Sequence, residues 1–249
     1  MPPEVAWPGA AALALAAAAF LAGGLVKGTL GIGLPLIALP LLSLGYPPTQ
    51  AITMVAVPVL ASNAWQAWDT GVSASGVRRF LPLIAMSTLF TLLTVPLTLT
   101  LSDASLRRVL AGAVLLAVVL NVLPLQLNVP PRQERWWSAA VGSLSGVLGG
   151  VSALTGPVII SYLMSLRLPR EVFVGTVSVI YLASALTLYG SMAAQGRFTL
   201  REVALSALAL LPMALGLAAG KRLRGKLGEL VFRRVMLGFL VALALLLMR

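Results

Sequence analysis

The sequence contains no cysteine and no histidine, and only seven of its 249 residues are acidic. The lack of cysteine excludes disulfides, thiol chemistry and thiolate metal sites. Each carboxylate falls in an expected loop or at the end of an apolar block, so the chain lacks the usual residues of a membrane protease, a metal-dependent pump or a carboxylate proton relay. We therefore predict that the protein is not an enzyme and holds no metal or cofactor. The acidic residues are Glu4, Asp69, Asp103, Glu134, Glu171, Glu202 and Glu229.

Charge of either sign is scarce, since 10% of the residues are charged and 59% are hydrophobic. An ordinary soluble domain carries about 25% charged residues. A soluble protein of this composition could not cover its surface, whereas a lipid bilayer solvates apolar surface. The composition predicts an integral membrane protein.

The number of membrane spans can be predicted from the long charge-free blocks. A spanning helix needs roughly 20 apolar residues. Seven blocks are near or above that length, and the blocks at 28–68 and 136–166 are long enough for a pair of helices. We predict an all-α polytopic membrane protein with about 8–10 transmembrane or re-entrant helices and no soluble domain. The first block is expected to be a retained span, because Glu4 replaces the basic region of a signal peptide. The blocks are 5–26, 28–68, 80–102, 109–131, 136–166, 172–196, 203–220 and the shorter 235–248.

The net charge of +11 comes from basic residues spread through short loops, which gives no folded basic surface for nucleic acid. Cytoplasmic loops of membrane proteins carry an excess of Lys and Arg. With ten segments, thirteen basic residues fall on one side and five on the other, so both termini are expected outside a bacterial plasma membrane. The first group is Lys27, Arg78, Arg79, Arg132, Arg135, Arg167, Arg170, Lys221, Arg222, Arg224, Lys226, Arg233 and Arg234. The second group is Arg107, Arg108, Arg197, Arg201 and Arg249.

The chain resembles itself at an offset of 122 residues. Gly24, Gly28, Pro35, Ser43, Leu44 and Pro47 then meet Gly146, Gly150, Pro157, Ser165, Leu166 and Pro169. A second match, of 107–112 with 233–238, lies at an offset of 126. We predict two membrane repeats, residues 1–128 and 129–249, with five segments each. An odd number of segments inserts the second repeat upside down, which is a recurrent transporter plan with the substrate site at the repeat interface.

Each half contains a glycine-rich break followed by a proline, Gly28–Pro35 in the first and Gly149–Pro157 in the second. Glycine loosens a helix and proline removes a donor. A broken backbone at membrane depth is tolerated where it is buried or lines a cavity. Pro35 and Pro157 therefore predict half-helices whose free N–H groups favour an anion. Close helix packing is the alternative role of the glycines.

Polar residues beside the breaks complete the predicted anion site. Thr29, Ser152 and Thr155 can donate to an oxyanion or bond back to their own helix. Lys27 either serves the site or extends to the lipid headgroups. Asn63 and Gln66, on one face, either coordinate substrate or bind a neighbouring helix. The candidate substrate-binding residues are Lys27, Thr29, Gly31, Gly33, Pro35, Asn63, Gln66, Gly150, Ser152, Thr155, Gly156 and Pro157.

Two further motifs resemble a known family. Pro40-Leu41-Leu42-Ser43-Leu44-Gly45 after the first break is similar to the first repeat of the sulfite exporter TauE/SafE family. Gly149-Gly150 through Gly156-Pro157, followed by Tyr162-Leu163 and Leu168-Pro169, is similar to its second repeat. The first break departs from the denser glycine run of many members. The resemblance implies a transporter that exports sulfite or an organosulfonate such as sulfoacetate.

Together these features predict a secondary transporter that exports a small anion by alternating access between two broken helices. An anion channel and a non-transporting membrane assembly protein remain as alternatives. The expected partners are the small anion and the lipid bilayer. The sequence leaves open the anion, the coupling ion and whether the chain is a monomer or a homodimer.

Overall fold

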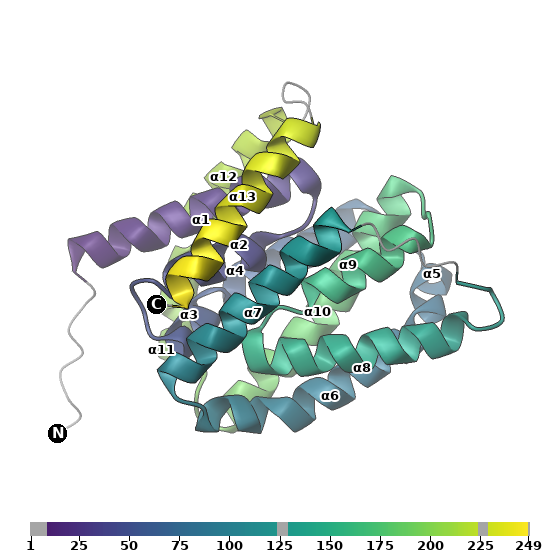
Figure 1. Ribbon diagram of the computed structural model, residues 1–249, viewed down its shortest axis with the longest axis horizontal. Coiled ribbons are helices and arrows are strands. Elements are labelled where there is room, and N and C mark those ends of the chain that lie inside the picture. Colours follow the sequence, from purple (N-terminus) through teal and green to yellow (C-terminus); the bar gives the residue numbers. More distant parts are fainter. Residues whose placement is uncertain (1–8, 124–128, 224–228, 249) are drawn as a thin grey trace.

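The computed structural model describes residues 9–123, 129–223 and 229–248, and within these ranges every regular element is an α-helix (Figure 1). This confirms the predicted all-α fold. The helices are α1 (Ala10–Leu30), α2 (Leu34–Leu42), α3 (Pro48–Met54), α4 (Ala56–Asp69), α5 (Ala74–Arg79), α6 (Leu81–Thr100), α7 (Asp103–Val122), α8 (Glu134–Ser152), α9 (Gly156–Ser165), α10 (Arg170–Ala194), α11 (Leu200–Leu208), α12 (Leu210–Leu223) and α13 (Glu229–Leu247).

Five helical stretches of the described chain are long and apolar enough to cross a bilayer: α1, α6, α7, α10 and the consecutive pair α11–α12. The protein is therefore polytopic, as its composition predicts. Helix α1 covers most of the expected first span, while Glu4 lies outside the described residues. Arg224 and Lys226 of the basic loop, and residues 124–128 at the predicted repeat boundary, also lie outside them.

The block at 28–68, predicted as long enough for a pair of helices, holds three after the end of α1: α2, α3 and α4. The additional interruption falls at Val55, and its physical cause is Pro58, which has no N–H to donate to the carbonyl of Met54. Ser206 of α11 replaces that bond. Its hydroxyl donates to the Met54 carbonyl at 2.7 Å and accepts from the Val57 N–H at 2.9 Å. Helix α11 is thereby fixed to the α3–α4 junction.

Glycines bring two pairs of helices into backbone contact. A Cβ added at Gly28 of α1 would meet the Leu217 carbonyl of α12, and one added at Gly220 would meet the Leu25 carbonyl of α1. On α8, a Cβ at Gly142 would meet the Leu83 carbonyl of α6. Small residues at such seams are how membrane helices approach closely. Of these, Gly28 belongs to the first predicted break, and it serves the packing role that the sequence offered as an alternative for the glycines of the breaks.

The helix pairs join the first part of the chain to the second. Helix α1 packs along α12, α6 along α8, α4 on α10 and α7 on α13, and Figure 1 shows α6 beside α8. Each pair combines one helix from residues 10–122 with one from residues 134–247. The two halves are thus interleaved rather than side by side. Inversion of one half relative to the other, and the boundary at residue 128, stay predictions.

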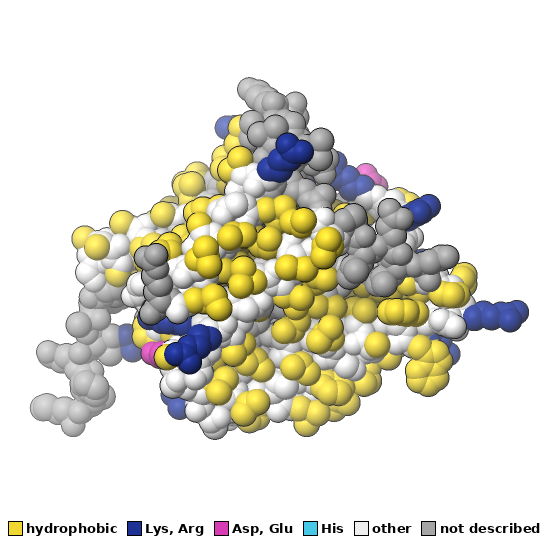
Figure 2. Space-filling model, viewed as in Figure 1, with side chains coloured by type: hydrophobic (Ala, Val, Ile, Leu, Met, Phe, Trp, Pro, Cys, Tyr) yellow, Lys and Arg dark blue, Asp and Glu magenta, His cyan; other side chains and the backbone are white. Residues whose placement is uncertain are grey.

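One face of the bundle gathers two loops that the charge pattern places on the same side. Arg79 of α5 donates a bidentate pair of hydrogen bonds to Glu134 at the start of α8, the second at 2.7 Å. These bonds raise the pKa of the Arg79 guanidinium above its usual value. Arg78 and Arg135 line the same recess. Trp136, next to Arg135 in sequence, is 78% exposed. Figure 2 shows hydrophobic side chains spread across the helices of the viewed face, as expected of a surface that faces lipid.

Candidate functional site

The first helix break is made by two glycines in the left-handed conformation. Helix α1 ends at Leu30, Gly31 follows with φ 86° and Gly33 with φ 101°. L-residues with a side chain rarely adopt such angles, so glycine fits here at little conformational cost. Helix α2 then begins at Leu34 with Pro35 in its first turn. The predicted half-helix start at Pro35 is confirmed.

A polar cluster from three helices surrounds this first break. The side chain of Lys27 is only 3% exposed, and its Nζ donates to Oδ1 of Asn63 on α4 at 2.5 Å. One turn further along α4, Nε2 of Gln66 donates to the Gly31 carbonyl at 2.8 Å. Ser178 of α10 donates to Oε1 of Gln66 at 3.1 Å. The structure thus brings together four predicted site residues, in bonded pairs that lie 36 and 35 positions apart in sequence. Lys27 points inward rather than to the headgroups.

Lys27 has no acidic partner within the described part of the chain, where the one ion pair joins Arg79 and Glu134. An ammonium group offers three N–H donors, and the Asn63 oxygen accepts one of them. A buried charge without a counter-ion is costly. An anion bound beside the first break would supply the missing negative charge.

The second break has the same order of elements with a different backbone. Helix α8 ends at Ser152, and Ala153 takes the left-handed conformation with φ 57°. Its N–H still reaches the Gly149 carbonyl at 2.8 Å. Helix α9 begins at Gly156 with Pro157 in its first turn. The half-helix start predicted at Pro157 is therefore confirmed as well.

Both breaks line one internal cavity of about 50 Å³. This space is large enough for a few water molecules or one small ion. The lining combines residues of the first break, residues of the second break and one face of α10. From the two breaks these are Gly33, Pro35, Gly149, Ala153, Leu154, Thr155, Gly156 and Pro157. The remaining polar lining residues are Thr91, Tyr181, Ser184 and Tyr189.

Tyr181 supplies an unused donor to this cavity. Its side chain is 7% exposed, and its hydroxyl has no hydrogen-bond partner among the residues that the structure describes. A Cβ added at Gly156 would lie 2.6 Å from that oxygen, so the hydroxyl sits against the first residue of α9. The N-terminus of a helix also carries unpaired N–H groups and a positive partial charge. Two kinds of donor therefore meet at one wall of the cavity.

The other predicted residues lie apart from the cavity or form bonds of their own. Thr29 donates to the Leu25 carbonyl of its own helix at 2.8 Å and to the Gly220 carbonyl of α12 at 3.3 Å. Ser152 donates to the Leu148 carbonyl at 2.6 Å. At Gly150 a side chain would meet Thr94 of α6, and the Thr98 hydroxyl donates to the Gly150 carbonyl at 2.5 Å. Thr155 does line the cavity.

Sequence reasoning missed the contribution of α10. Ser178, Tyr181 and Ser184 are spaced by three residues inside an apolar block, which places them on one face of a helix. Polar groups at membrane depth are functional candidates, so this spacing was a usable signal. Thr91 carried no comparable signal, because it is one of several threonines along α6. No group of three or more His, Cys, Asp or Glu residues lies together in the described ranges.

Comparison with known proteins identifies a family for this chain. The model of one protein family, described as Sulfite exporter TauE/SafE, matches residues 15–247. The match includes both helix breaks, α4 and all of α10. No curated protein and no solved structure matches the chain.

Proposed function

Because this chain belongs to the sulfite exporter TauE/SafE family, we propose that it is a secondary transporter that exports a small anion by alternating access at the cavity between its two helix breaks. One observation carries the proposal: Gly33 and Pro35 of one break and Gly156 and Pro157 of the other line the same cavity. Discontinuous helices that point their termini at a shared midplane site are how many transporters hold charged substrates. Membership of this family is also consistent with a multi-pass membrane protein that is not an enzyme.

The sign of the substrate follows from the groups available. No carboxylate lines the cavity, whereas Thr91, Tyr181 and Ser184 do. The hydroxyls of Thr91 and Ser184 are engaged with the Gly146 carbonyl and with Ser87, so Tyr181 is the donor left for an anion among these three. The N-terminus of α9 contributes a positive partial charge. Lys27, held by Asn63 at the first break, does not line the cavity but places a basic group in the same region of the fold. These groups favour an anion and disfavour a cation.

The volume of the cavity narrows the choice of anion. A space of about 50 Å³ suits an ion of few atoms, so sulfite fits it better than a longer organosulfonate such as sulfoacetate. The apolar part of the lining, which includes Leu36, Ile160 and Leu188, supplies shape without further donors. We therefore place sulfite first among the substrates and sulfoacetate second.

Transport of this kind needs no coupling ion. Moving one elementary charge through 100 mV is worth about 2.3 kcal/mol. In a bacterial plasma membrane with an inside-negative potential, a dianion such as sulfite leaves downhill by about twice that amount. We expect electrogenic export in proteoliposomes that contain the full chain. Flux that does not respond to an imposed potassium-diffusion potential contradicts the electrogenic mechanism.

The central experiment measures uptake of radiolabelled sulfite and sulfoacetate into proteoliposomes, with other small anions as competitors. Gly31→Ala and Gly156→Ala should each reduce the rate, because both substitutions disturb a break. Gly112→Ala on α7 is the matched control, since an added Cβ meets no atom within 4 Å there. Full activity in both break variants would show that the cavity is not the transport site.

The two alternatives predict different results. An anion channel would give single-channel currents too large for alternating access. A non-transporting assembly protein would keep its activity when Gly31, Gly156 and Pro157 are replaced, provided that the variants reach the membrane. Sedimentation of the detergent-solubilised protein distinguishes a monomer from a homodimer.

A further inference from the structure

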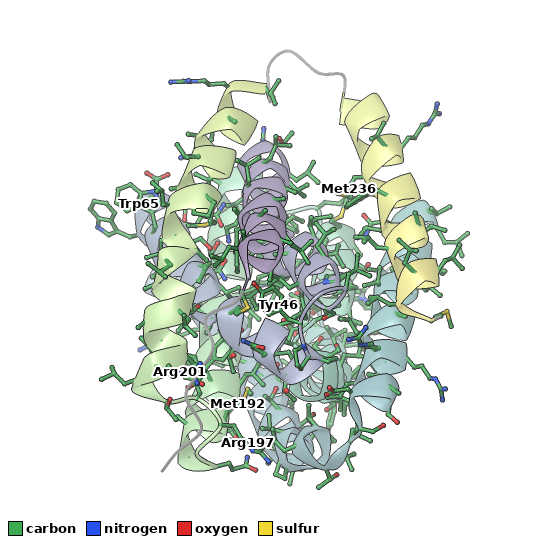
Figure 3. All side chains as sticks on the ribbon, turned by 90° about the vertical axis from the view of Figure 1, so that its left-hand side faces the viewer. Tyr46, Trp65, Met192, Arg197, Arg201 and Met236 are labelled. Carbon is green, nitrogen blue, oxygen red and sulfur yellow. The ribbon has the colours of Figure 1, made fainter. Side chains whose placement is uncertain are left out.

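A second and much wider cavity lies near the α10–α11 loop. Its volume is about 770 Å³, and its walls come from α1, α3, α11 and the loop that joins α10 to α11. The polar lining residues are Tyr46, Thr49, Gln50, Thr53, Arg197, Arg201 and Glu202. In Figure 3, Arg197, Arg201 and Met192 lie close together in the lower half of the molecule, with Tyr46 above them.

The two arginines keep their guanidinium groups available. Neither side chain has an ion-pair or hydrogen-bond partner within the ranges that the structure describes, and both residues are exposed. Glu202 is the one carboxylate of the lining, and it is occupied by the cap of α11. It accepts from the Thr199 N–H at 2.9 Å and from the Thr199 hydroxyl. The lining therefore presents two cations and one engaged carboxylate, which also interacts electrostatically with the neighbouring Arg201.

Arg201 does not stabilise the helix in which it lies. It is the second residue of α11, where the macrodipole disfavours a positive charge. Arg197 follows Gly196, which turns the chain with φ 68°, and its N–H donates to the Met192 carbonyl at 2.8 Å. The backbone on both sides of the loop is thus fixed, and both arginines line the cavity. Thr49, Gln50 and Thr53 of the α3 segment add neutral polar groups to its lining.

Neighbouring residues of α10 line this cavity and the inner one. Tyr189 lines the inner cavity, and Met192, nearly one helical turn later on α10, lines the wide one. The Tyr189 hydroxyl donates to the Ile52 carbonyl at 3.2 Å, directly before Thr53 of the wide cavity. The Tyr189 ring also lies 5.4 Å from that of Phe198, which follows Arg197. Tyr189 thus contacts residues next to the lining of the wide cavity while it lines the inner one.

We propose that the wide cavity is a second anion-binding site, in which Arg197 and Arg201 concentrate a small oxyanion or sulfonate before or after it passes Tyr189. Two cations on a low-dielectric wall raise the local concentration of anions and their encounter rate. The ligand is the transported anion of the proposed function, and to that extent the inference rests on it. Binding in the wide cavity itself requires no transport.

The natural absence of cysteine allows a direct test. A single cysteine placed by Gln50→Cys in the full chain is labelled with an anionic and with a cationic methanethiosulfonate reagent in zwitterionic vesicles. The anionic reagent should react faster, and Arg197→Gln with Arg201→Gln should lower the anionic-to-cationic rate ratio about tenfold. Arg108→Gln, which removes an exposed arginine of α7 outside the cavity, should leave the ratio unchanged.

Competition separates the possible ligands. Millimolar sulfoacetate should slow labelling when both arginines are present and should have no effect in the double variant. A ratio that does not change in the double variant overturns the proposal. So does protection that appears only when anionic lipid is added, since the arginines would then hold a headgroup. If the unmodified protein gives these labelling results but shows no anion flux in proteoliposomes, the transport proposal alone is contradicted.

Discussion

The two helix breaks share a sequence order but differ in what they contribute. The first break uses Gly31 and Gly33 at positive φ, and it is surrounded by polar contacts from α4 and α10. The second break places Ala153 at positive φ, and at the start of α9 it meets the hydroxyl of Tyr181 from α10, which has no hydrogen-bond partner in the described part of the chain. The first break thus supplies a fixed and well-held charge, and the second supplies open donors.

This difference teaches that a duplicated pattern need not give a duplicated site. Lys27 has no basic counterpart in the second half, because the residue 122 positions later is Gly149. In our account, charge recognition belongs to the first break and close hydrogen bonding belongs to the second. Each break can therefore be changed separately, and the two should fail in different ways.

The largest effect is expected from removing the charge of the first break. Lys27→Met should reduce sulfite flux by about 100-fold, because the buried basic group beside the first break, which attracts the anion from outside the cavity lining, is lost. Folding should survive, since replacing a buried charge by an apolar group of similar length is often tolerated. Proteoliposome flux at several sulfite concentrations is the measurement. Lys221→Met, at an exposed lysine of α12, is the control and should transport normally. Near-normal flux in Lys27→Met would show that Lys27 takes no part in anion recognition.

A smaller effect, and a rescue, should distinguish the second break. Gly156→Ala places a Cβ against the Tyr181 hydroxyl and should lower flux about tenfold. Adding Tyr181→Phe removes that oxygen, so the double variant should exceed Gly156→Ala while staying below the unmodified protein. Gly190→Ala is the control on α10, where an added Cβ has open space. No recovery in the double variant would mean that the hydroxyl and Gly156 act independently.

Gln66→Ala should have a moderate effect confined to the first break. The substitution leaves the Gly31 carbonyl without its side-chain donor, and loss of one hydrogen bond of about 1 kcal/mol corresponds to about a fivefold rise in the half-saturating sulfite concentration. Gln195→Ala, at an exposed glutamine after α10, is the matched control and should leave the half-saturating sulfite concentration unchanged. An unchanged half-saturating concentration in Gln66→Ala would separate this polar cluster from the anion site.

The smallest effects concern stability and should have opposite signs in the two breaks. Ala153→Gly removes a left-handed non-glycine residue and should stabilise the fold by up to about 1 kcal/mol, after the entropy of glycine is counted. Gly31→Ala adds a side chain at φ 86°, 3.3 Å from Val174, and should destabilise it by at least that amount. Thermal unfolding of the purified protein in detergent measures both. Unfolding temperatures that shift in the same direction for both variants would contradict the proposed difference in backbone strain between the two breaks.

The sequence predicted the membrane fold well because hydrophobicity is local, and it located both breaks because Pro35 and Pro157 have fixed backbone preferences. It also selected Lys27, Asn63 and Gln66, which the structure joins. It did not show whether each hydroxyl donates to an anion or to the backbone, because the bonding partners of residues such as Thr29 depend on tertiary packing. The interruption at Val55 was missed, since Ser206 stabilises it from 152 positions away. The spacing of Ser178, Tyr181 and Ser184 was a signal that the sequence analysis did not use, whereas the lack of a partner for the Tyr181 hydroxyl among the described residues is a property of the folded state.

The most direct test of a shared anion site is to locate a bound anion. Selenite is the heavier analogue of sulfite, and its selenium atom can be placed by anomalous diffraction from crystals of the intact chain. Our account predicts one dominant peak in the cavity between the two breaks, within hydrogen-bond distance of the Tyr181 hydroxyl and beside the first turn of α9. A selenium peak that contacts residues of one break alone, or that lies outside this cavity, would contradict it.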